Sequence, residues 1–99
     1  MNLNYGGWVY IMANKHNNVV YIGSTSELLF RVIEHREREY PTSFTAKYNC
    51  DKLVYYEPFD CIEDAHTKER QMKKWKREWK NELITKFNPE WKDLFDTLS

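Results

Sequence analysis

Hydrophobic residues in the first quarter of the chain predict two neighbouring β-strands. Trp, Val, Tyr and Ile, which are strong strand formers, dominate residues 7–12 and 19–22. Between these segments, residues 14–18 carry three Asn together with Lys and His, a composition typical of turns. The pattern predicts a β-hairpin whose second strand ends at Gly23.

After the hairpin, the apolar positions change to helical spacing. They predict a helix over residues 27–39, with Ser26 as the N-cap residue and Pro41 just beyond its end. Residues 42–51 are mostly polar and predict a connection without regular structure. Residues 53–57, Leu-Val-Tyr-Tyr-Glu, predict a third strand.

The remaining residues predict helices. Asp60 followed by Glu63 matches a capping box and predicts a helix that runs to Trp75 or beyond. Residues 81–87 either continue this helix or open a second one, and a short helix is expected over residues 91–98.

This order of elements predicts an α/β (α+β) fold, a small three-stranded, mainly antiparallel sheet flanked by helices. At 99 residues the chain has room for one domain, which we expect to span residues 1–99. Two cysteines are too few for a disulfide framework, the N-terminal residues lack a signal-peptide pattern, and no apolar run is long enough to cross a membrane. A cytoplasmic location without membrane contact is therefore expected.

The net charge and the distribution of basic residues indicate how the protein could bind nucleic acid. The formal net charge of zero argues against a protein that binds nucleic acid along its whole surface. Residues 68–80, however, contain seven basic and two acidic residues. A basic helical segment on a neutral protein indicates local phosphate contacts, and an ordinary solvated helix face is the alternative.

Five polar side chains could together carry out phosphodiester hydrolysis: Tyr10, Tyr21, Arg31, His35 and Glu69. The hairpin places the two tyrosines almost opposite each other on one face, and the four-residue spacing places Arg31 and His35 on one helix face. Hydrolysis needs an activated water and neutralisation of the charge that grows on the phosphate. A glutamate can hold one Mg²⁺, and an arginine fork matches a phosphate.

These residues and their spacing resemble the GIY-YIG nuclease family, specifically its short stand-alone branch. The resemblance extends from about residue 7 to residue 91. The second family tripeptide is present as Tyr21-Ile22-Gly23, whereas the first reads Trp8-Val9-Tyr10 and keeps only its tyrosine.

The resemblance implies a divalent-metal-dependent endonuclease that acts on DNA, with one Mg²⁺ or Mn²⁺ on Glu69. In the family a tyrosine at the position of Tyr10 or Tyr21 helps to activate the water, and the arginine at Arg31 binds the scissile phosphate. His35 matches a position at the reaction centre. A catalytic domain without a separate targeting domain is expected to have low sequence specificity.

The resemblance also suggests one supporting residue, Asn88, which matches a late asparagine that supports the site in some members. Some relatives carry a lysine just after the second tripeptide, and this chain has Ser24 there, so a lysine-assisted base is not expected at that position. Four lysines are expected to contact nucleic acid: Lys47, Lys73, Lys74 and Lys76.

Each of these residues also has an ordinary structural interpretation. Tyr10 and Tyr21 are cross-strand packing partners in most hairpins of this kind, and Glu69 is spaced to pair with Lys73. Two other functions therefore stay open. One is a catalytically weak or inactive nucleic-acid-binding module, with DNA favoured over RNA. The other is a protein-interaction subunit of a repair complex, whose partner supplies the specificity.

Overall fold

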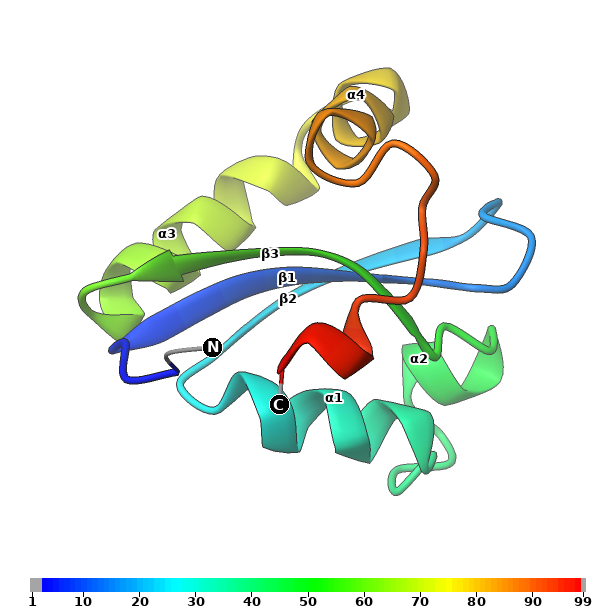
Figure 1. Ribbon diagram of the computed structural model, residues 1–99, viewed down its shortest axis with the longest axis horizontal. Coiled ribbons are helices and arrows are strands. Elements are labelled where there is room, and N and C mark those ends of the chain that lie inside the picture. The colour runs from blue at the N-terminus through cyan, green and yellow to red at the C-terminus, as the bar shows by residue number, and fades with distance from the viewer. Residues whose placement is uncertain (1–2, 99) are drawn as a thin grey trace.

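The computed structural model describes residues 3–98, and a three-stranded antiparallel sheet forms its centre (Figure 1). The strands are β1 (Gly7–Ala13), β2 (Val20–Thr25) and β3 (Lys52–Phe59), in the order β2-β1-β3. β1 pairs with β2 and with β3, both antiparallel. The predicted fold class is confirmed.

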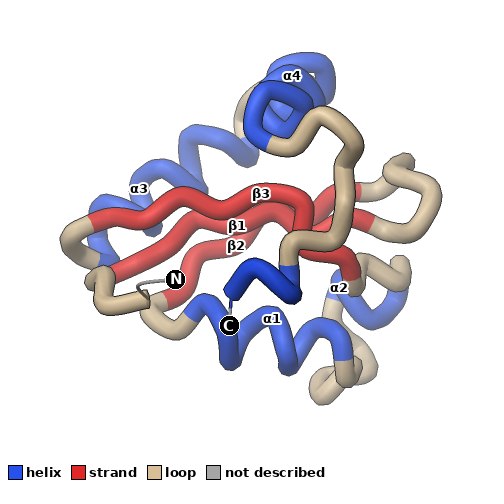
Figure 2. The backbone as a smooth tube through the Cα atoms, in the orientation of Figure 1, coloured by secondary structure: helices blue, strands red, loops and turns tan. Residues whose placement is uncertain are grey.

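Helices cover both faces of the sheet (Figure 2). In the described part of the chain they are α1 (Leu28–Arg36), α2 (Phe44–Lys47), α3 (Ile62–Lys73), α4 (Arg77–Phe87) and the 3₁₀ helix η1 (Phe95–Leu98). α3 and α4 lie on one face, and α1 and η1 lie on the other. None of the helices within residues 3–98 combines the length and the apolar character that crossing a membrane requires.

The central strand β1 is buried along its whole length because helices cover both of its faces. Val9 and Ile11 belong to the apolar layer beneath α3 and α4. Trp8, Tyr10 and Met12 point the other way, into the layer beneath α1. This alternation, which follows from the two-residue period of a strand, places Tyr10 on the α1 face of the sheet.

The second strand is longer than predicted. Gly23 does not end it, since β2 continues to Thr25, which pairs with Trp8. Gly23 itself pairs with Tyr10. Gly23 was predicted to terminate the strand, but it lies within the sheet and leaves space for the Tyr10 side chain.

Both predicted helix caps are wrong. α1 begins at Leu28 after Glu27 rather than after Ser26, and neither Glu27 nor Cys61, the N-cap residue of α3, makes a side-chain cap hydrogen bond. The Thr25 hydroxyl instead accepts a hydrogen bond from the Glu27 backbone N–H at 3.0 Å. The α3 start is favoured electrostatically, because its first turn carries two acidic residues.

Helix ends also differ from the prediction. α1 ends at Arg36, three residues early, and the chain reverses at Arg38 with a positive φ of 52°. α3 ends at Lys73, and a separate helix, α4, follows from Arg77. The closing helix is limited to the 3₁₀ turn η1.

The predicted polar connection contains α2, a single helical turn. Its N-cap is Ser43, whose hydroxyl accepts a hydrogen bond from the Ala46 backbone N–H at 3.3 Å. This turn carries Phe44 and Thr45 towards the α1 face of β2, where they approach the tyrosine pair. The short helix therefore contributes directly to the candidate site.

Candidate active site

Tyr10 and Tyr21 lie on the same face of the hairpin, as predicted, with ring centroids 6.3 Å apart. They are diagonal rather than opposite, because Tyr10 pairs with Gly23 and Tyr21 pairs with Met12. A Cβ atom at Gly23 would lie 2.5 Å from the Tyr10 hydroxyl, so only glycine leaves room for the Tyr10 ring. The glycine of the second tripeptide thus positions the tyrosine of the first.

His35 joins this pair from α1. Its Nε2 lies 2.8 Å from the Tyr10 hydroxyl, its Nδ1 lies 2.7 Å from Thr45 Oγ1, and its ring centroid is 5.5 Å from that of Tyr21. We assign the tautomer from hydrogen-bond balance. The Tyr10 hydroxyl is buried and has His35 as its hydrogen-bond partner, so it donates to Nε2, and the Nδ1–H donates to Thr45.

The Tyr10–His35 pair is electrically neutral near pH 7. Burial, followed by the nearby Tyr21, raises the pKa of Tyr10 well above its usual range, against the opposing charge of Arg31. Burial, assisted by the positive charge of Arg31, lowers the pKa of His35 from 6.5 to about 4. Both groups therefore keep their uncharged forms in the resting protein.

Arg31 lies one helical turn before His35 on α1. Its Nε is 3.5 Å from a carboxylate oxygen of Glu34, and both side chains are partly exposed. Glu34 also accepts a hydrogen bond from the Tyr40 hydroxyl at 3.1 Å. An exposed ion pair of this kind contributes ~0–1 kcal/mol, so an incoming phosphate can compete with it for Arg31.

Glu69 approaches from α3, on the opposite face of β2. The Ser24 hydroxyl donates a short hydrogen bond to Glu69 Oε1, and Lys73 Nζ lies 2.7 Å from Oε2. His66 Nδ1 is 2.6 Å from Ser24 Oγ. Burial raises the pKa of Glu69, but the hydrogen bonds from Lys73 and Ser24 outweigh it and hold this pKa below its usual value.

Lys73 connects the two faces of β2. Its ammonium lies 5.9 Å from the centre of the Tyr21 ring while it pairs with Glu69. The charge of Glu69 in turn contributes to the raised pKa of Tyr10. The site therefore wraps around the exposed edge of the sheet and contains the five predicted catalytic residues on its two sides.

Glu69 is the carboxylate that could hold a divalent cation on this side of the site. No group of three or more His, Cys, Asp and Glu side chains able to hold a metal occurs within residues 3–98. Mg²⁺, however, is commonly held by one or two carboxylates, with waters and substrate phosphates as its other ligands. Glu69 is ionised, and the Lys73 side chain that covers one of its oxygens is half-exposed and can move away.

Asn88 lies apart from these residues. It is buried at the end of α4, where its side chain donates hydrogen bonds to the carbonyl oxygens of Val54 at 3.2 Å and Lys92 at 2.8 Å. These bonds fasten the C-terminal segment to β3. The structure thus gives Asn88 an architectural contact rather than a contact with the tyrosines.

The four predicted lysines separate into two groups. Lys73 belongs to the site, and Lys47 lies near it, with its ammonium 5.6 Å from the Tyr48 ring centre. Lys74 and Lys76 are exposed at the junction of α3 and α4, where Lys76 lies 5.9 Å from a tryptophan ring centre. Of the four lysines, Lys73 therefore contacts the site residues directly, and Lys74 and Lys76 follow it in sequence.

Several polar side chains at the site were not predicted. Thr45 orients His35, Ser24 and His66 contact the Glu69 side of the site, and Glu34 pairs with Arg31. His66 stands three residues before Glu69, so helical spacing could have identified it. Nothing in the sequence around Thr45 indicates its contact with His35.

A scan against protein families gives one match. The family model of the GIY-YIG catalytic domain matches residues 6–83. Neither the curated proteins nor the solved structures gave a significant match. The matched segment includes both tyrosines, Arg31, His35 and Glu69, and it ends before Asn88. Since this segment covers most of the 99 residues, the chain belongs to the GIY-YIG family, which is of nuclease type.

Proposed function

We propose that this protein is a divalent-metal-dependent endonuclease that hydrolyses phosphodiester bonds in DNA with low sequence specificity. The observation that carries the proposal is the convergence of two different pairs at the edge of β2. The neutral Tyr10–His35 pair lies on one face, the ionised Glu69–Lys73 pair lies on the other, and Tyr21 contacts both.

Tyr21 is the tyrosine best placed to contact the attacking water. Tyr10 is fully buried and its hydroxyl is engaged by His35, whereas Tyr21 is only half-buried and lines an open cleft. We therefore assign water activation to Tyr21. Tyr10 and His35 hold the Tyr21 ring in place and act as positioning residues.

In this proposal, Arg31 and the metal ion on Glu69 neutralise the negative charge of the scissile phosphate. The Arg31 guanidinium binds the scissile phosphate through its planar fork. Glu69 would hold one Mg²⁺ or Mn²⁺, which supplies charge neutralisation at the phosphate and acidifies a bound water. Ser24 keeps the Glu69 carboxylate oriented through its hydrogen bond.

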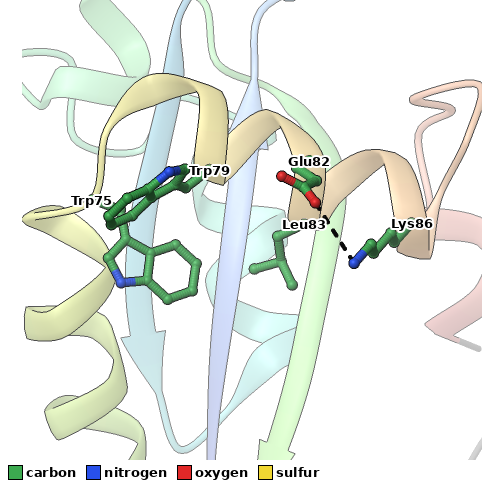
Figure 3. A pocket seen from close by; sticks show the side chains of 5 residues that line it. All are labelled: Trp75, Trp79, Glu82, Leu83 and Lys86. Carbon is green, nitrogen blue, oxygen red and sulfur yellow. Dashed lines mark ion pairs between the residues drawn. The ribbon is translucent and has the colours of Figure 1, made fainter.

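A protein-interaction subunit is the second candidate function, because one observation favours it. An apolar groove of about 270 Å³ lies on α4 and on Trp75, two residues before the helix begins (Figure 3). It is lined by Trp75, Trp79, Glu82, Leu83 and Lys86. Trp79 is largely exposed, and exposed apolar surfaces of this kind mark contacts with other proteins.

The location proposed for this enzyme is the cytoplasm. Cys50 and Cys61 are both free thiols in the structure, which agrees with a reducing compartment.

A cleavage assay tests the proposed activity. The purified protein is incubated with labelled single-stranded, duplex and branched DNA in Mg²⁺, in Mn²⁺ and in EDTA, with labelled RNA as a further substrate. We expect cleavage of DNA with either metal, none in EDTA, and recovery when Mg²⁺ is restored. On a size-exclusion column, the cleavage activity must elute in the same fractions as the protein, which excludes a contaminating nuclease. DNA that binds but stays intact would favour the non-catalytic module, and absence of both binding and cleavage would favour the interaction subunit.

A further inference from the structure

A row of aromatic rings runs outward from the candidate site along α2. The Phe44 ring centroid lies 5.8 Å from that of Tyr21 and 4.7 Å from that of Tyr48. Phe44 is 45% exposed and Tyr48 is 42% exposed. Large aromatic side chains are mostly buried in folded proteins, so two adjacent exposed rings next to a candidate active site need an explanation.

Two of these rings, those of Tyr21 and Phe44, border a cleft of about 270 Å³ between α2 and the basic segment. The lining residues are Val20, Tyr21, Ile22, Phe44, Lys73 and Lys80. The cleft therefore combines aromatic and aliphatic walls with two ammonium groups, one of which, that of Lys73, pairs with Glu69 beside the cleft at 2.7 Å. Apolar walls suit the flat face of a nucleobase, and the ammonium groups suit the phosphates on either side of that base.

We propose that this cleft binds one unpaired nucleobase of the substrate, stacked on Phe44, next to the bond that is cleaved. The proposal rests on the proposed nuclease function and narrows its substrate to DNA that is single-stranded or has an unpaired nucleotide at the cleavage position. A base within a duplex is stacked on both faces and cannot offer a face to Phe44. Lys73 and Lys80 would contact the neighbouring phosphates.

Position and charge favour this cleft as the DNA-binding site over the apolar groove lined by Trp75 and Trp79 (Figure 3). The cleft shares Tyr21 with the candidate site, whereas the groove contains none of the site residues. The rim of the groove also carries Glu82, which pairs with Lys86 at 3.7 Å and would repel a phosphate (Figure 3). The cleft is lined by two ammonium groups, one of them paired with Glu69, whereas the groove is lined by one ammonium group that is paired with Glu82, so the cleft carries more positive charge.

A binding experiment in EDTA tests the proposal without requiring cleavage. Fluorescence anisotropy is measured with three labelled probes: an oligothymidylate strand, a strand of equal length made of abasic sites, and a duplex. Phe44→Leu removes the ring and keeps an apolar side chain. We expect it to weaken oligothymidylate binding about tenfold, equivalent to about 1.4 kcal/mol, and to leave the abasic strand and the duplex unchanged.

Phe87→Leu is the matched control. Phe87 is 46% exposed and also packs against two tyrosines, but it lies on the β3 side of the molecule. This variant should bind all three probes like the wild type. Phe44→Tyr, which keeps the ring, should retain oligothymidylate binding, and Phe44→Met, which removes the ring but fills more of its space, provides a second test if Phe44→Leu lowers the melting temperature.

Two outcomes would overturn the proposal. An equal loss on the abasic strand would show that Phe44 affects phosphate contacts rather than a base, and unchanged oligothymidylate binding would show that no base stacks there. Because metal is absent, these results are independent of the cleavage assay. A protein that cleaves DNA but shows either outcome would keep its proposed function and lose this base site.

Discussion

The candidate site residues on the two faces of strand β2 differ in charge and in exposure to solvent. On the α1 side, Tyr10 is buried, His35 is half-buried, and both are neutral and fixed by hydrogen bonds of 2.7–2.8 Å. On the α3 side, Glu69 is ionised and pairs with the half-exposed Lys73. We call these the tyrosine–histidine side and the glutamate–lysine side.

The difference follows from the free energy of burial. Neutral groups can be buried if their hydrogen bonds are made, whereas an ionised group must stay paired or near water. The tyrosine–histidine side can therefore be rigid before substrate arrives. The glutamate–lysine side must remain adjustable, because Glu69 exchanges Lys73 for another cation in the proposed function.

The largest effect is expected on the glutamate–lysine side. Glu69→Gln keeps the size of the side chain and can still accept the Ser24 hydrogen bond, so the melting temperature should change little. Cleavage should fall about 10³-fold or more, because the proposed metal ligand is lost. Glu82→Gln, which removes an exposed carboxylate on α4, is the control and should cleave normally. Normal cleavage by Glu69→Gln would exclude the assigned metal site.

The two tyrosines should respond differently. Tyr21→Phe keeps the ring contacts and should lower cleavage by about 10²–10³-fold with little change in melting temperature. Tyr10→Phe should mainly destabilise the fold, by about 1–3 kcal/mol, because His35 Nε2 loses its donor. Cleavage rates and urea unfolding measure the two effects separately. An active Tyr21→Phe variant beside an inactive, stable Tyr10→Phe variant would reverse the assigned roles.

Arg31→Lys tests whether charge alone is enough at the phosphate. Lysine keeps the positive charge but lacks the planar fork, so we expect cleavage to fall about tenfold, or about 1.4 kcal/mol of barrier. Arg38→Lys is the control, because Arg38 makes only an exposed pair with Asp51 at 3.7 Å. If both variants cleave at the wild-type rate, Arg31 is a surface charge.

The smallest effect concerns stability and pH. Because folding lowers the pKa of His35 from 6.5 to about 4, the unfolded chain takes up the proton first as the pH falls. The contribution of neutral His35 is thus complete above about pH 6.5 and is lost as the pH falls towards 4. Linkage would give about 3 kcal/mol for a fully buried group, and solvent screening of the half-buried ring reduces this to roughly 1–2 kcal/mol.

Urea unfolding from about pH 7 to pH 4 measures this contribution. His35→Gln should show a shallower loss of stability over this range than the wild type. His16→Gln, in the exposed hairpin turn, is the matched control. Parallel curves for the wild type and His35→Gln would show that His35 is not shielded in the folded state.

Local patterns predicted much of the fold and the tyrosine–histidine side. Residues 7–12 and 19–22 are runs of strand formers joined by a turn, so the hairpin and the shared face of its two tyrosines follow from short-range rules. The helical spacing of Arg31 and His35 is equally local. These relations involve residues that are close in sequence or joined by one turn.

Contacts between distant segments could not be predicted in this way. Thr45 reaches His35 because one capped turn folds under α1, and Ser24 reaches His66 across 42 residues of sequence. The predicted caps at Ser26 and Asp60 also failed. The Glu27 backbone N–H donates to the Thr25 hydroxyl, and α3 begins after Cys61 without a side-chain cap, so the local capping preference did not decide where these helices begin.

The contact between Gly23 and Tyr10 limits how this sequence can evolve. The backbone of Gly23 is not in the left-handed region, so its conformation would accept any residue, and the obstacle is only the Tyr10 ring. Alanine at position 23 should therefore be harmful beside Tyr10 and tolerated beside a small residue there. Positions 10 and 23 form one steric unit, so a side chain at position 23 requires a smaller residue than tyrosine at position 10.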